Sequence, residues 1–268
     1  MSALDTAAPA ATTSRRAAPS PIPLARITAT ELRKSFDTRS GLWLMVAIGV
    51  LAVLATAAVV VFAPAGQQTY GSFAAAVGVP MTVILPIIAI LSVTGEWSQR
   101  TGLTTFTLVP RRGQVIAAKA IVSVGVGVVS ILLAAAVGAV GNVVGSLIAG
   151  VDTTWDLSLA ALSQIVLANV LGLLVGFMLG VLLRSSAAAI VAYFVYAFVV
   201  PPLTSLLAAS QDWFHGLRPW VDFNFAQGAL YNDPLTSSQW AHLAVTATGW
   251  VLVPTAVGVW LVMRAEVK

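Results

Sequence analysis

Charged residues are scarce in this sequence: Asp, Glu, Lys and Arg together make up 9% of its 268 residues. A soluble domain typically carries about 25% of these residues. A chain with so few charges cannot cover a water-facing surface, and 58% of its residues are hydrophobic, with a mean hydropathy of +0.92. We therefore expect lipid to be the solvent for most of the chain.

Several kinds of chemistry are also missing. Cysteine is absent, which excludes disulfides and thiol chemistry. The chain has no phosphate-cradling GxxxxGK[ST] motif that would bind a nucleotide. The hydrophobic runs hold no carboxylate pair or histidine cluster for hydrolysis or metal binding. We predict that the chain is not an enzyme and binds no metal or cofactor itself.

Six long runs without charged residues predict an all-α membrane protein with six transmembrane helices. A helix needs about 20 apolar residues to cross a bilayer. The runs cover residues 42–62, 73–94, 120–149, 157–183, 187–209 and 241–263 of the transmembrane domain, 41–268. Residues 1–23, rich in Ala, Thr, Ser and Pro, are expected to form a disordered cytoplasmic tail.

Residues 24–40 show a basic amphipathic pattern before the first run. The apolar residues near one helical face are Leu24, Ile27, Leu32 and Phe36. Most of the charged residues of this segment lie elsewhere on the same helix. The pattern predicts a helix in the membrane interface; a solvated linker is the alternative.

The positions of the basic residues predict the orientation in the membrane. Of the 14 Lys and Arg residues, 13 lie before the first run, between the second and third runs, between the fourth and fifth runs, or after the last run. These segments are all on one side of the membrane, and Arg218, in the segment 210–240, is the exception on the other side. Because basic residues favour the cytoplasm, we expect both termini and the loop 95–119 there, with 210–240 external. The expected location is a bacterial cytoplasmic membrane. The net charge of +4 then reflects orientation and not nucleic-acid binding.

Glycines at intervals of three or four residues predict close helix packing. They are Gly138, Gly141 and Gly145 in the third run, and Gly172, Gly176 and Gly180 in the fourth. Small residues at this spacing let helix backbones approach each other. The contact could lie within one subunit or between two subunits.

Four residues are candidates for a gate or a substrate pathway. Pro80 and Pro86 interrupt the second run, and a proline removes a backbone donor and can kink a helix. Tyr193 and Tyr196 place two hydroxyl groups in the fifth run. Static packing is the alternative for all four, since prolines are tolerated in membrane helices.

The loop 95–119 carries the pattern that suggests a family. Glu96 follows the second run, Thr101-Gly102 and a short apolar stretch come next, and Pro110-Arg111-Arg112 precedes Lys119. This arrangement resembles the type-2 ATP-binding-cassette (ABC) exporter permeases. Those proteins have Glu, a Gly-Thr-like turn, Pro with basic neighbours and a Lys entering the third span. Here the Gly-Thr order is inverted. The six runs and the preceding amphipathic segment extend the resemblance over the whole chain.

The resemblance implies the partners and the coupling residues. Two six-span subunits, identical or not, would pair in the bilayer, and two ATPase subunits would bind ATP and magnesium on the cytoplasmic side. The segment 210–240 would form short re-entrant helices. The residues that would couple this chain to the ATPase are Glu96, Arg100, Thr101, Gly102, Pro110, Arg111, Arg112 and Lys119.

The predicted function is therefore the permease subunit of an ATP-driven exporter. Its uncharged interior favours a lipid-like or amphipathic drug-like substrate. Two alternatives remain: a non-transporting assembly or sensory subunit that recruits a cytosolic partner, and a secondary transporter. The lack of charge in the runs weakens the second alternative, because proton relays and ion sites use ionisable groups.

Overall fold

The computed structural model describes residues 22–98, 112–232 and 234–264, and the elements in these ranges are helices. Six helical stretches are long and apolar enough to cross a membrane. Four are α2 (Arg39–Phe62), α3 (Tyr70–Ser98), α5 (Arg112–Ala149) and α6 (Leu159–Leu183). The other two each combine three elements. The predicted fold class, an all-α protein with six such helices after a short N-terminal helix, is confirmed, and the chain is a multi-pass helical membrane protein.

The fifth and sixth stretches each contain a π-helical turn. The fifth is α7 (Ser186–Phe194), η2 (Val195–Val199) and α8 (Val200–Ser210). The sixth is α11 (Ser237–Ala247), η4 (Thr248–Leu252) and α12 (Val253–Arg264).

Prolines explain both π-helical turns. Pro201 and Pro202 follow η2, and Pro254 follows η4. Because proline has no backbone N–H, the regular hydrogen-bond ladder cannot continue through these positions. The amide of Val200 instead donates to the carbonyl oxygen of Val195, five residues earlier. Such single π turns are frequent at functional sites.

The helix ends differ from the predicted limits of the loop 95–119. Helix α3 continues to Ser98 and α5 begins at Arg112, so residues at both ends of the predicted loop are helical. Glu96 and Lys119 therefore lie within long helices, near their ends. Residues 99–111 lie outside the described residues.

Short helices occupy the segment between the fifth and sixth stretches. They are α9 (Asp212–Val221), α10 (Phe223–Gly228) and the 3-10 turn η3 (Ala229–Tyr231). Asp222 ends α9 and starts α10, where its carboxylate accepts a hydrogen bond from the amide of Phe225. This is the usual way in which Asp caps a helix N-terminus. Phe214 and Phe223 are buried, whereas Trp213 and Trp220 are exposed.

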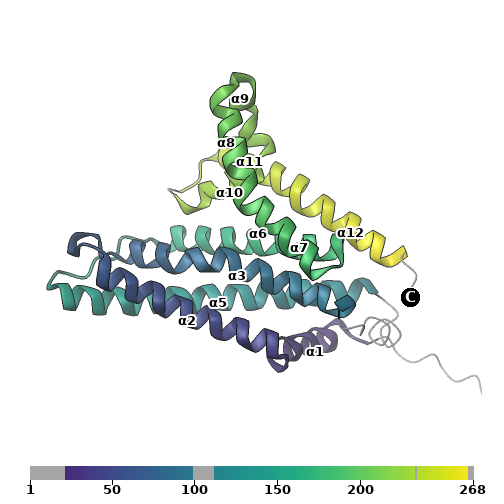
Figure 1. Ribbon diagram of the computed structural model, residues 1–268, viewed down its shortest axis with the longest axis horizontal. Helices are drawn as coiled ribbons and strands as arrows, with labels where there is room; N and C mark the ends of the chain where they lie inside the picture. Colours follow the sequence, from purple (N-terminus) through teal and green to yellow (C-terminus); the bar gives the residue numbers. More distant parts are fainter. Residues whose placement is uncertain (1–21, 99–111, 233, 265–268) are drawn as a thin grey trace, which may run out of the picture.

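Four long helices run side by side. Figure 1 shows α2, α3, α5 and α6 as one bundle, with α8 and α9 projecting away from it and α12 running obliquely back. Helix α1 (Leu24–Asp37) lies at one end of the bundle. The end of α12 reaches the same end, where the Arg112 guanidinium donates to the carbonyl oxygen of Val262 at 3.2 Å. We call this the α1 end.

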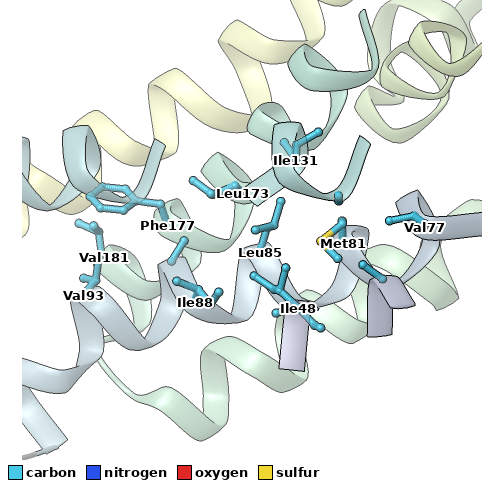
Figure 2. Packing of buried hydrophobic residues seen from close by; sticks show 14 of the residues in the cluster. Ile48, Val77, Met81, Leu85, Ile88, Val93, Ile131, Leu173, Phe177 and Val181 are labelled. Atoms are coloured by element: carbon cyan, nitrogen blue, oxygen red, sulfur yellow. The ribbon is translucent and has the colours of Figure 1, made fainter. Parts of the chain in front are cut away.

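The main hydrophobic cluster fills the middle of the bundle. Figure 2 shows Val77, Met81 and Leu85 of α3 facing Leu173 and Phe177 of α6 and Ile131 of α5. A second cluster joins α6 to the fifth stretch, α10 and α11, with Phe223 and Leu230 completely buried. Helices α3 and α6 therefore hold both halves of the protein together.

The predicted glycines of α6 pack inside this chain. A Cβ atom added to Gly176 would lie 2.5 Å from the carbonyl oxygen of Pro86. One added to Gly180 would lie 3.3 Å from that of Ile90. At Gly172 the nearest atom is the side-chain nitrogen of Gln227, at 3.3 Å. These glycines let α6 approach α3 and α10, which favours packing within one subunit over a subunit contact.

The glycines of α5 are also packed against neighbours in the same chain. An added Cβ would collide with Thr56 of α2 at Gly141, and would lie 2.6 Å from Gln68 at Gly145. Gly138 is less crowded, with its nearest neighbour in Phe73 at 3.6 Å. The two tight positions require glycine because α5 lies directly against α2 and the start of α3.

Candidate functional site

Four charged side chains meet at the α1 end of the bundle. Glu31 and Lys34 come from α1, Glu96 from the last turns of α3, and Lys119 from the beginning of α5. We call these four residues the charge cluster. Glu31 is 6% exposed, Glu96 5% and Lys119 6%, whereas Lys34 is partly exposed. Three ionised groups are thus removed from water together.

Lys119 is the centre of the charge cluster. Its ammonium nitrogen lies 2.6 Å from a carboxylate oxygen of Glu31 and 3.1 Å from one of Glu96. It also donates to the backbone carbonyl oxygen of Ser92 at 2.9 Å. Two of the three ammonium protons are thus donated to Glu31 and Ser92, and Glu96 lies at ion-pair distance. Lys119 therefore ties α5 to both α1 and α3.

Lys34 closes the charge cluster from its outer side. Its ammonium nitrogen lies 2.8 Å from Glu31 and 3.3 Å from Glu96. Burial by itself would lower the pKa of Lys34, but hydrogen bonds and charge attraction from the two carboxylates outweigh it and raise the pKa above its usual value. Two carboxylates and two ammonium groups give the cluster no net charge. Such compensation is what a buried ionic group requires.

The charge cluster brings together two of the predicted coupling residues, Glu96 and Lys119. We expected the Glu96 carboxylate to face a partner protein, but it is buried against the two lysines because α3 continues past it. Arg112 lies at the start of α5 and contacts α12. The remaining predicted coupling residues lie outside the described residues; they are Arg100, Thr101, Gly102, Pro110 and Arg111.

Sequence reasoning missed Glu31 and Lys34. Of the apolar residues expected at the membrane interface, Leu24, Leu32 and Phe36 are exposed, whereas Ile27 is buried together with Glu31. The reason is that Glu31 pairs with Lys119, which turns the Ile27–Glu31 face inward. Ile27, Glu31 and Lys34 follow each other at intervals of four and three residues, so they share one helical face. This spacing was the sequence pattern from which a buried face with Glu31 and Lys34 could have been predicted.

A second candidate site is a small cavity between α3, α6, the fifth stretch and α10. Its volume is about 190 Å³. We call it the polar cavity, because side chains with hydrogen-bonding groups line it: Thr82, Asn169, Tyr193, Tyr196, Asn224, Gln227 and Tyr231. Polar groups at membrane depth are expected to be paired or to line a pathway. Both of the tyrosines that were pathway candidates, Tyr193 and Tyr196, line this cavity.

Thr82 and Tyr193, which both line the polar cavity, are joined by a hydrogen bond that Pro86 makes possible. Pro86 has no N–H, so the carbonyl oxygen of Thr82, four residues earlier, loses its helical partner. The hydroxyl group of Tyr193 donates a hydrogen bond to that oxygen. Thus one of the prolines considered for a gate is used to attach the fifth stretch to α3. The other proline considered for a gate, Pro80, lies in the same helix and is less buried than Pro86.

Two buried polar groups of the cavity have no hydrogen-bond partner among the described residues. The side-chain oxygen of Asn169 is one, because its amide nitrogen bonds only to Ile165 in its own helix. The hydroxyl of Tyr196 is the other; it lies beside the Asn224 side chain without a hydrogen bond of good geometry. Gln227 is satisfied by the carbonyl oxygen of Ala168 at 2.7 Å. A buried polar group without a partner is costly, so something polar is expected in this cavity.

The sequence matches no model of a known protein family and no characterised protein.

Proposed function

We propose that this chain is the permease subunit of an ATP-driven ABC exporter that moves a lipid-like or amphipathic substrate out of the cytoplasm. The observation that carries the proposal is the charge cluster. It joins the amphipathic helix α1 to the end of α3 and the beginning of α5. These are the helices that flank the segment with the exporter-like pattern.

The charge cluster can transmit a mechanical force. Separating its buried charges would leave ions without partners, which costs about 3–5 kcal/mol. A push on the residues between α3 and α5 would therefore move α1 and both helix ends as one unit. With no nucleotide-binding motif in the chain, that push comes from two separate ATPase subunits, which hold ATP and magnesium. A second permease subunit completes the exporter.

Helix α3 connects the charge cluster to the polar cavity. Glu96 lies ten residues after Pro86 in α3, a distance of about 15 Å along a helix. Pro86 packs against Gly176 and releases the carbonyl oxygen that Tyr193 binds. A displacement of α3 at the charge cluster would therefore reach α6 and the fifth stretch.

The test is to coexpress the chain with an ABC ATPase encoded beside it and to reconstitute the purified complex. We expect copurification and ATP hydrolysis that an amphipathic substrate stimulates. Glu96→Gln keeps the shape of the side chain and removes its charge; it should leave insertion and copurification intact but reduce stimulated hydrolysis severalfold. The control is Arg33→Gln, an exposed position on the neighbouring helix α1.

The outcomes separate the competing functions. Copurification of a partner without any hydrolysis or substrate movement would instead favour an assembly or sensory subunit. Substrate movement in vesicles without any ATPase would favour a secondary transporter. Equal stimulation in the Glu96→Gln and Arg33→Gln complexes would refute coupling through the charge cluster.

A further inference from the structure

We infer that the polar cavity binds the neutral, hydroxyl-bearing group of an amphipathic molecule. The inference deepens the proposed function and rests on it, because it names the polar part of the substrate. Four independent features of the cavity support it: its electrostatics, its hydrogen-bonding deficit, its size and its opening.

The first feature is the absence of charge. No Asp, Glu, Lys, Arg or His lies among the described residues that line the polar cavity. Asp222, two residues before the cavity residue Asn224, is already paired with Arg218 at 3.1 Å. A charged ligand would be left without a counterion in a region of low dielectric, which is strongly unfavourable. The ligand group is therefore neutral.

The second feature is a buried hydrogen-bond acceptor that has no donor in the described part of the chain. The unpaired atom of Asn169 is an oxygen, which only accepts hydrogen bonds. The Tyr196 hydroxyl can donate or accept. A ligand that satisfies the Asn169 oxygen must supply a donor, and a hydroxyl group supplies one without charge and can accept a hydrogen bond in return.

The third feature is the volume of about 190 Å³. Pockets that enclose a whole drug-sized ligand measure roughly 300–1,000 Å³. The polar cavity therefore has room for one small polar group, and the rest of the ligand must lie outside it.

The fourth feature is the position of the opening. Asn169 forms the closed side, with 3% of its surface exposed, whereas Phe198 is 57% and Tyr231 42% exposed. Next to Phe198, the outer face of the fifth stretch is apolar and exposed at Val191, Val195 and Val199. A ligand with its hydroxyl groups at Asn169 would thus extend an apolar tail along this face into the lipid.

The experiment measures binding to the chain in phosphatidylcholine nanodiscs without the ATPase. The probes are octyl glucoside below its micelle concentration, octyltrimethylammonium and octanoate as charged probes with the same tail, and free glucose. We expect saturable binding of octyl glucoside that the charged probes do not displace. If unlabelled octyl glucoside displaces the bound octyl glucoside and free glucose does not, the site takes a membrane-borne ligand. Displacement by glucose at equal concentration overturns the amphipathic assignment.

Three variants locate the binding. Asn169→Leu removes the unpaired oxygen and should weaken octyl glucoside binding about threefold to tenfold, the effect of one hydrogen bond. Because this oxygen has no partner in the described residues, the thermal stability should stay equal or rise, which separates lost binding from lost folding. Gly228→Leu adds a side chain at a cavity position with open space around it and should abolish binding. The control Gly216→Leu, also in open space but on α9, should not.

Unchanged affinity in both Asn169→Leu and Gly228→Leu would overturn the inference. So would the absence of saturable binding by any probe, since the cavity would then hold only water. Neither result bears on ATP-driven export, which the hydrolysis measurement with the partner ATPase tests separately.

Discussion

The hydroxyl group of Tyr193 donates a hydrogen bond to the carbonyl oxygen of Thr82, 111 residues earlier in the chain. That oxygen needs an outside donor because Pro86 interrupts the helical ladder of α3. One hydrogen bond thus compensates for a proline and attaches the fifth stretch to the bundle. The stretch also packs against α6 through the second hydrophobic cluster, but most of its side chains are exposed.

We therefore predict that Tyr193→Phe destabilises the protein by about 1–3 kcal/mol, the cost of leaving a buried acceptor without a donor. Thermal unfolding in detergent measures the change. The matched control is Tyr196→Phe, which removes a hydroxyl without a partner and should have little effect.

A double variant isolates the role of the proline. Pro86→Ala restores the backbone N–H, so Tyr193→Phe should cost less in that background than in the natural sequence. Equal costs in both backgrounds would show that the Tyr193 hydroxyl does not compensate for Pro86.

Gly176 is predicted to tolerate no side chain. A Cβ atom there would lie 2.5 Å from the backbone oxygen of Pro86, so α3 and α6 must separate to accommodate it. Gly176→Leu should cost at least about 1–3 kcal/mol through overpacking, visible as a lower unfolding temperature. Gly125→Leu, where the added atoms meet open space, is the control. If both variants melt alike, α3 and α6 are not packed as described.

These two relationships also show what the sequence could and could not reveal. The six spans were predictable because a transmembrane helix is defined by a local run of apolar residues, and Gly176 belonged to a recognisable small-residue motif. The partners Pro86 and Tyr193 were not predictable, since they are separated in sequence and meet only through the packing of α3 with the fifth stretch. For the same reason the burial of Glu31 was not predictable, since its partner Lys119 is 88 residues away in the sequence.

Asp156 is predicted to give the opposite end of the bundle an acid-sensitive contact. Its carboxylate accepts a hydrogen bond from the amide of Gly71 at 2.7 Å. Slight burial would raise the pKa of Asp156, but the hydrogen bonds from Thr69 and Gly71 outweigh it and lower the pKa. A lowered pKa means that the contribution to stability is present above the usual value near 3.8 and is lost as pH falls through the folded-state pKa.

Asp156→Asn should therefore flatten the loss of stability below about pH 4. Because Asp156 is exposed, the effect should not exceed about 1 kcal/mol. The measurement is the unfolding temperature of both proteins between pH 3 and pH 6. Asp152→Asn, at an exposed position of the same turn, is the control; an identical pH profile for the natural protein and Asp156→Asn would contradict the prediction.

The orientation in the membrane is open to a direct test. The basic residues collect at the segments on one side of the six stretches, and Arg218 is the exception. Alkaline phosphatase fused within residues 211–239 should be active, because that enzyme works only outside the cytoplasm. The same reporter fused after Ser185, between the fourth and fifth stretches, should be inactive. The reverse pattern would invert the proposed orientation and put the charge cluster on the outer side.

The last prediction concerns the two lysines of the charge cluster. Lys119 is buried and contacts both Glu31 and Glu96, whereas Lys34 contacts the same carboxylates from a partly exposed position. Removing a buried partner leaves uncompensated charge and costs about 3–5 kcal/mol, while an exposed pair contributes about 0–1 kcal/mol.

We expect Lys119→Met to lower the unfolding temperature far more than Lys34→Met. Replacing Glu31 and Glu96 with Gln in the Lys119→Met background should recover much of the lost stability, because the buried side chains are then neutral and need no counterion. This recovery separates an electrostatic role from simple packing, which the added Gln substitutions would not repair. If Lys119→Met and Lys34→Met were equally mild, the charge cluster would not hold α1 to α3 and α5, and force transmission through it would have no structural basis.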